Sequence, residues 1–159
     1  LVLPTDFLVE CEGHGQAEVA VGHGVGVWAT AEMYPTNPVR AETVGRTEEI
    51  IGTWLKARGG RSRLVLATKV AGKGPVIRPG QPVTGAIMRE ALEGSLRRLG
   101  TDYVDLYQLH WPNRGSYHFR QAWHYAPRAA DRGAVDVHMI DVLTAAQALM
   151  EEGKIRALG

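Results

Sequence analysis

Three residues that can donate, accept or share a proton lie near the ends of predicted strands: Tyr34, Lys69 and His110. All three residue types serve in general acid–base catalysis. A tyrosine, with an ordinary pKa of about 10, acts as an acid near neutral pH only where a nearby positive charge stabilises its phenolate. Lys69 can supply that charge, and His110 can orient a carbonyl oxygen. A buried lysine normally needs a carboxylate partner, and the position where one would make chemical sense holds Ala29.

Each of these residues also has an interpretation without catalysis. A lysine at a strand end is commonly a solvated surface charge, and a single histidine there is as often a structural residue. The catalytic interpretation is favoured because three ionisable groups come from three successive strands. In parallel α/β folds the C-terminal ends of the strands carry the active site.

The elements that must position these residues alternate between short β-branched runs and amphipathic helical patterns, which is typical of βα units. We predict strands at 25–29, 64–70, 103–110 and 155–158, and a further strand at 1–5 despite Pro4. We predict helices at 16–23, 46–58, 87–99 and 139–152. Strand starts near 25, 64 and 103 recur about every forty residues, a spacing found in both (β/α) barrels and doubly wound sheets. No Gly-x-Gly-x-x-Gly motif follows a predicted strand, so a Rossmann phosphate loop is not supported.

The composition predicts a single domain over residues 1–159, since 45% of the residues are hydrophobic and 22% are charged. The formal net charge of +1 offers no electrostatic reason for a nucleic-acid or membrane partner. No run of about 18 apolar residues and no signal segment is found. Cys11 is the only cysteine, so a cytoplasmic location is predicted. The histidines lack metal-ligand spacing, so no metal site is expected.

A long segment after His110 interleaves aromatic and basic side chains. We interpret Trp111, Trp123 and Tyr125 as candidates for the wall of a substrate pocket, because they follow a strand that ends at the predicted site. Ordinary packing of a long loop is an equally good interpretation. Binding of single-stranded nucleic acid is disfavoured.

Three runs together resemble the aldo-keto reductase family: TAEMY at 30–34, GRTEEIIGTWLKARGGRSRLVLATKV at 45–70, and REALEGSLRRLGTDYVDLYQLHWPNR at 89–114. They are most similar to its bacterial Tas-like branch, which is related to potassium-channel beta subunits. The resemblance covers nearly all of residues 25–159. It implies an α/β fold, the TIM (β/α)8 barrel, which binds NADPH and reduces small aldehydes or ketones to alcohols.

The resemblance also assigns roles to individual residues. Tyr34 corresponds to the general acid, Lys69 to the residue that lowers its pKa, and His110 to the residue that orients the substrate carbonyl. Thr5 and Ala29 fall at cofactor-binding positions, where the family has a threonine and the aspartate of its catalytic tetrad. Since Ala29 cannot pair with Lys69, we expect turnover to fall by roughly tenfold or more.

The sequence accounts for about five of the eight βα units, so it predicts a partial barrel made of the N-terminal half. Such a half exposes unpaired strand edges and apolar surface. Three alternatives follow: the missing units belong to a separate chain, two copies assemble into a homo-oligomer, or the sequence is a piece of a longer protein, which we favour. The alternatives to an enzyme are a non-catalytic binding or regulatory subunit of barrel shape, and an inactive fragment.

Overall fold

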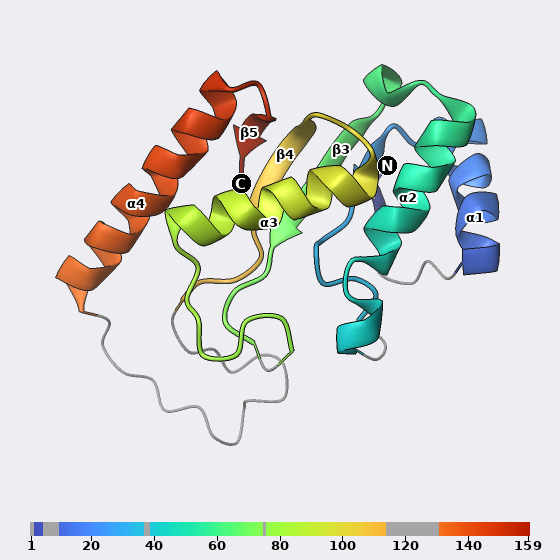
Figure 1. Cartoon of the computed structure of the whole chain (residues 1–159). Coiled ribbons are helices and arrows are strands. Elements are labelled where there is room, and N and C mark those ends of the chain that lie inside the picture. Colours follow the sequence, from blue (N-terminus) through green and yellow to red (C-terminus); the bar gives the residue numbers. More distant parts are fainter. Residues whose placement is uncertain (1, 5–9, 37–38, 75, 114–130) are drawn as a thin grey trace.

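Five parallel strands form one sheet in the order β1-β2-β3-β4-β5 (Figure 1). The computed structural model describes residues 2–4, 10–36, 39–74, 76–113 and 131–159. The strands are β1 (Val2–Pro4), β2 (Val27–Ala29), β3 (Val65–Val70), β4 (Val104–Leu109) and β5 (Ile155–Leu158). All five predicted strands are therefore confirmed, with ends that differ by no more than two residues.

The strand order decides between the two architectures that the spacing left open. Doubly wound sheets reverse direction partway through the sheet, whereas this order follows the chain without a reversal. Sequential parallel strands joined through helices are the arrangement of a (β/α) barrel. The prediction of a partial barrel is therefore confirmed, and the described strands β1 and β5 form its two open edges.

The described residues form four α-helices between the strands, and in Figure 1 α3 lies across β3 and β4 while α2 lies beside it, next to α1. They are α1 (Glu10–Gly22), α2 (Arg46–Arg58), α3 (Gly85–Leu99) and α4 (Arg132–Glu151), with short 3-10 helices η1 (Ala41–Thr43) and η2 (Arg61–Arg63). The bounds predicted for α2 are correct. Those for α1 and α4 are wrong at the start, by six and seven residues respectively, as 16 compares with 10 and 139 with 132.

The early start of α4 has a local cause. The Asp131 carboxylate accepts a hydrogen bond from the backbone N–H of Ala134 at 3.2 Å, which caps the first turn. Thr84 caps α3 in the same way, because its hydroxyl accepts from the N–H of Ile87 at 3.2 Å. The cap residues extend both helices beyond the apolar periodicity from which they were predicted.

Side-chain contacts identify the two faces of the sheet. The Thr68 hydroxyl donates to Glu48 of α2 at 2.6 Å, and the Tyr107 hydroxyl donates to the backbone carbonyl of Met88 in α3 at 2.9 Å. Thr68 and Tyr107 therefore face the helices. Because successive side chains of a strand alternate between faces, Lys69 and its register partner Gln108 face the opposite, inner side.

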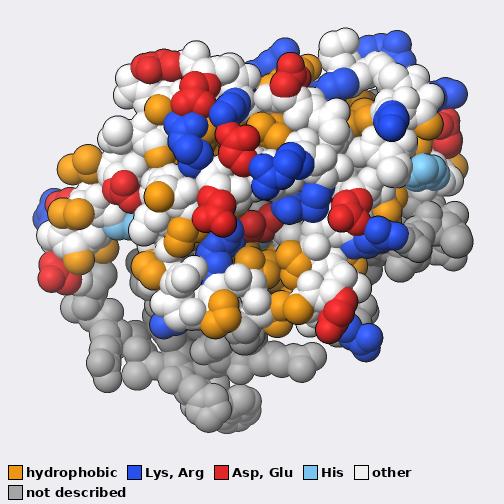
Figure 2. Space-filling model, viewed as in Figure 1, with side chains coloured by type: hydrophobic (Ala, Val, Ile, Leu, Met, Phe, Trp, Pro, Cys, Tyr) orange, Lys and Arg blue, Asp and Glu red, His pale blue; other side chains and the backbone are white. Residues whose placement is uncertain are grey.

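The core fills the space between the sheet and the helices. Its fully buried side chains include Trp28, Leu66, Tyr107, Ile51, Met88, Leu92, Leu99 and Leu149. On the outside, Figure 2 shows acidic and basic side chains interspersed over the helical face. α4 also exposes large apolar side chains, among them Val137 at 69% and Ile140 at 66%. This surface and the open β5 edge are what a partial barrel was expected to expose.

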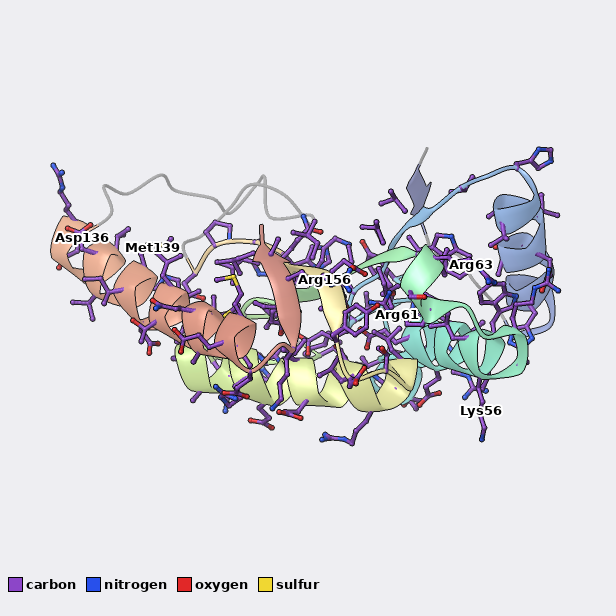
Figure 3. The ribbon with its side chains drawn as sticks, turned by 90° about the horizontal axis from the view of Figure 1, so that it is seen from above. Lys56, Arg61, Arg63, Asp136, Met139 and Arg156 are labelled. Atoms are coloured by element: carbon purple, nitrogen blue, oxygen red, sulfur yellow. The ribbon has the colours of Figure 1, made fainter. Side chains whose placement is uncertain are left out.

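The N-terminal ends of the strands are held by charged pairs. Arg61 of η2 and Arg156 of β5, both labelled in Figure 3, donate to the two carboxylate oxygens of Asp105 at 2.8 and 2.7 Å. Asp105 also accepts from the backbone N–H of Leu66 at 2.9 Å. This carboxylate therefore ties β3, β4 and β5 together and lies at the opposite end of the strands from Lys69 and His110.

Candidate active site

Tyr34, Lys69 and His110 come together at the C-terminal ends of β2, β3 and β4. The Tyr34 and His110 rings meet edge to face, with their centroids 5.7 Å apart and an interplanar angle of 74°. The Lys69 ammonium lies 5.0 Å from the centroid of the Tyr34 ring. The tertiary structure thus places a phenol, an ammonium group and an imidazole in one cluster, from three strands that are far apart in the sequence.

Backbone hydrogen bonds hold the segment that carries Tyr34. After β2 ends at Ala29, the N–H of Thr30 donates to the carbonyl of Ala67 at 2.8 Å, and the N–H of Glu32 donates to that of Lys69 at 3.2 Å. The N–H of Tyr34 then donates to the carbonyl of Ala31 at 3.1 Å, which closes a turn. The segment therefore runs along β3 before it turns Tyr34 toward Lys69.

Lys69 donates to a neutral acceptor at this site. Its Nζ atom is 2.7 Å from the backbone carbonyl oxygen of Thr30. Ala29, the position where the family resemblance expects a carboxylate, is the register partner of Ala67 on β3. A methyl group at that position contributes no hydrogen bond and no charge to Lys69.

His110 is held in its neutral form. Burial, together with the smaller effect of the nearby positive charge of Lys69, lowers the pKa of the imidazole from 6.5 to about 4. The Nδ1 atom is buried and has no hydrogen-bond partner within the described residues. At neutral pH the ring therefore carries one N–H donor and one bare nitrogen, which suits it to orient an oxygen atom.

Glu32 does not take the place of the missing carboxylate. Its side chain is 7% exposed, and both of its oxygens are bound by the guanidinium group of Arg78, one of them at 2.9 Å. Sequence reasoning missed Arg78. No local pattern could have identified it, because Arg78 lies 46 positions from Glu32 in the sequence.

Trp111 forms one side of the cluster. Its ring lies 4.8 Å from that of His110, measured between centroids, and its indole N–H donates to the backbone carbonyl of Lys73 at 3.4 Å. This placement suits the predicted pocket wall. The other predicted wall residues, Trp123 and Tyr125, and the predicted cofactor residue Thr5 lie outside the described residues.

Within residues 2–4, 10–36, 39–74, 76–113 and 131–159, no three or more His, Cys, Asp or Glu side chains are grouped so that they could hold a metal ion. In the same part of the chain, no helix combines the length and apolar character that crossing a membrane requires. The cytoplasmic location and the homo-oligomer remain predictions.

Known proteins share both the sequence and the fold of this chain. A sequence profile of the aldo/keto reductase family matches residues 16–159. Protein tas of Escherichia coli is 41% identical over 156 residues, which covers 94% of this chain and 43% of that protein.

Two solved structures give the same result. An aldo-keto reductase from Bacillus halodurans, in its holo form, superposes with a TM-score of 0.70 at 27% identity. The superposition covers all of this chain and 45% of the Bacillus halodurans chain. An aldo-keto reductase from Klebsiella pneumoniae in complex with NADPH gives a TM-score of 0.63 at 32% identity, over 99% of this chain and 44% of its own. The chain thus spans less than half the length of these relatives. The profile match over residues 16–159 shows that the chain belongs to the aldo/keto reductase family.

Proposed function

We propose that this chain carries the proton-transfer groups of an NADPH-dependent oxidoreductase that reduces aldehydes or ketones to alcohols. The observation that carries the proposal is the cluster of Tyr34, Lys69 and His110. The Klebsiella pneumoniae relative, solved with NADPH, supports the choice of cofactor.

The residues around Tyr34, Lys69 and His110 suit a bound cofactor and substrate at His110 but not at Ala29. The buried Nδ1 atom of His110 has no hydrogen-bond partner in the described part of the chain. Buried polar atoms are normally paired, so a group bound here would satisfy it. The side chain of Ala29, in contrast, offers no polar atom to a cofactor. NADPH, when bound, supplies the hydride, and the protein supplies orientation and charge.

In this proposal each side chain has one task. Tyr34 donates its hydroxyl proton to the oxygen of the reduced carbonyl. Lys69 stabilises the phenolate that remains, because its ammonium lies 5.0 Å from the centroid of the tyrosine ring. His110, neutral at pH 7, donates its one N–H to the carbonyl oxygen and aligns it with the tyrosine hydroxyl.

The test is consumption of NADPH with a broadly accepted aldehyde such as a nitrobenzaldehyde, followed by nicotinamide absorbance. Tyr34→Phe should lower turnover by at least about 100-fold, which is the usual contribution of a positioned proton donor. Tyr103→Phe is the matched control, since Tyr103 packs between Arg61 and Arg156 at the other end of the strands. Failure of the wild-type chain to bind NADPH would contradict the proposal.

A second candidate function is a non-catalytic binding or regulatory subunit, and Ala29 is the observation that favours it. Lys69 meets a backbone carbonyl at a position where the family resemblance expects an ion pair. This candidate predicts that the chain binds NADPH without consuming it. It also predicts that restoring a carboxylate at position 29 leaves turnover absent.

A further inference from the structure

We propose that Glu32 and Arg78 form a positioning pair, which sets the separation of Tyr34, Lys69 and His110. The inference rests on the proposed function for its purpose, but the geometry it predicts is measurable without turnover. Glu32 and Arg78 bind each other and the backbone of Ala71, so their effect is exerted through the backbone that they hold.

The pair connects the two segments that carry the proton-transfer groups. Glu32 lies two residues before Tyr34, and its carboxylate accepts the backbone N–H of Ala71, two residues after Lys69. Arg78 donates to the same carboxylate and, at 3.0 Å, to the backbone carbonyl of Ala71. Both polar groups of the Ala71 backbone are thus bound by one ion pair. The segment after β2 and the segment after β3 cannot slide past each other while it is intact.

Burial and shape make this connection stiff. The Glu32 side chain is 7% exposed and that of Arg78 is 11% exposed, so water cannot replace either partner without opening the segment. The guanidinium group engages both carboxylate oxygens, and a two-point contact of this kind fixes orientation as well as distance. A lysine, with one point charge on a flexible stem, cannot reproduce it.

The same segment also seats Trp111 against His110. The residue after Ala71 is Gly72, and a Cβ atom there would lie 2.4 Å from Nε1 of Trp111. The indole therefore occupies the space where a side chain at position 72 would be. Since Trp111 packs on His110 at 4.8 Å, the Glu32–Arg78 pair reaches all three members of the cluster.

The precision of the cluster is what the pair is expected to control. Displacement of a reacting group by about 1 Å can lower a rate by roughly 100-fold. The exposed pair Arg89–Glu152 has similar bidentate geometry, at 2.7 and 2.8 Å, but it joins α3 to the C-terminal end of α4. It therefore offers a matched comparison in which an arginine–glutamate pair is lost away from the cluster.

The experiment measures nuclear Overhauser contacts between the Tyr34 and His110 rings and hydrogen exchange of the Ala71 amide. In Arg78→Met we expect the ring contact to weaken severalfold and the Ala71 amide to exchange faster, while the core contact between Tyr107 and Met88 persists. Arg89→Met should change neither signal. Arg78→Lys should lie between wild type and Arg78→Met, and added methylguanidinium should restore the ring contact in Arg78→Ala.

Unchanged ring contacts in Arg78→Met would overturn the proposal, as would parallel loss of the Tyr107–Met88 contact, which would indicate a purely structural role. Should Arg78→Met not fold, Glu32→Gln keeps the shape and the acceptor for Ala71 and tests the same contact. Where the wild-type chain consumes NADPH, Arg78→Met should lower kcat with little change in KM for NADPH. Absent turnover in wild type would contradict the proposed function, and the ring contacts would still decide this inference.

Discussion

The Lys69 ammonium lies 5.0 Å from the centroid of the Tyr34 ring; Lys69 is on β3, and Tyr34 is in the turn that follows the adjacent parallel strand β2. The hydrogen bond of Lys69 to the Thr30 carbonyl, at 2.7 Å, fixes the amine over the segment that leads to the tyrosine. This relationship keeps a positive charge beside a phenol. Position 29 lacks a carboxylate, and a carboxylate there would lie near the lysine on the neighbouring strand.

Ala29→Asp should raise NADPH-linked turnover by roughly tenfold, since a carboxylate beside Lys69 would keep the ammonium charged and oriented. The measurement is the steady-state rate with a nitrobenzaldehyde. Ala29→Asn is the control of equal size without charge. An equal gain in both variants would show that shape or hydrogen bonding, and not charge, limits the wild-type chain.

The titration of His110 should make the stability of the fold depend on pH. Its pKa is about 4 in the folded chain and 6.5 in the ordinary state, because burial first and Lys69 second disfavour the imidazolium form. Between these values the unfolded chain binds more protons at this position. The contribution is therefore complete above about pH 6.5 and is lost as the pH falls toward 4.

The size of this contribution is at most about 3 kcal/mol, and solvent at the partly exposed ring reduces it. Urea unfolding of wild type and of His110→Gln across this pH range gives the value by difference. The wild-type curve should fall more steeply with acid. Parallel curves would show that His110 titrates alike in the folded and unfolded chains.

Arg98→Met should lower the free energy of unfolding by about 3–5 kcal/mol, because it leaves the buried Glu48 carboxylate without its cation. Glu48 is fully buried, accepts a hydrogen bond from Nε of Arg98 at 2.8 Å, and forms an ion pair with Nη2 of the same guanidinium group at 2.7 Å. Burial raises the pKa of Glu48, and Arg98 opposes that rise. The deficit of the variant relative to wild type should therefore be smaller at pH 5 than at pH 8, where the carboxylate must ionise.

Chemical denaturation at both pH values measures this difference. Arg89→Met removes an exposed partner from Glu152 and should lower the free energy of unfolding far less than Arg98→Met does. If Arg98→Met lowered the free energy of unfolding as little as Arg89→Met does, Glu48 would have another partner or would be protonated in wild type.

Gly72→Ala should displace the Trp111 indole, because the new Cβ atom would lie 2.4 Å from its Nε1 atom. Loss of this packing admits water to His110, so the pKa of the imidazole should rise from about 4 toward 6.5. The shift is measurable by NMR titration of the ring. Gly74→Ala, where the nearest atoms would be 3.9 Å away, should leave the titration unchanged.

Much of the fold follows from local patterns. The period of the apolar residues and the glycine after Arg58 defined α2 correctly, and the β-branched runs identified the strands. Because parallel strands end at one edge of a sheet, the predicted end of β3 with Lys69 was expected at the same edge as His110. These features depend on residues that are close together in the sequence, so they are legible without the structure.

Other features depend on which distant residues meet, and only the tertiary structure decided them. Strand order separated the barrel from the doubly wound sheet, because either order satisfies the same spacing. The partner of Glu32 is Arg78, and the low pKa of His110 arises first from burial and second from the positive charge of Lys69. Sequence alone determined which groups this protein has for proton transfer. Their charge, separation and support come from packing between segments tens of residues apart, which no local pattern encodes.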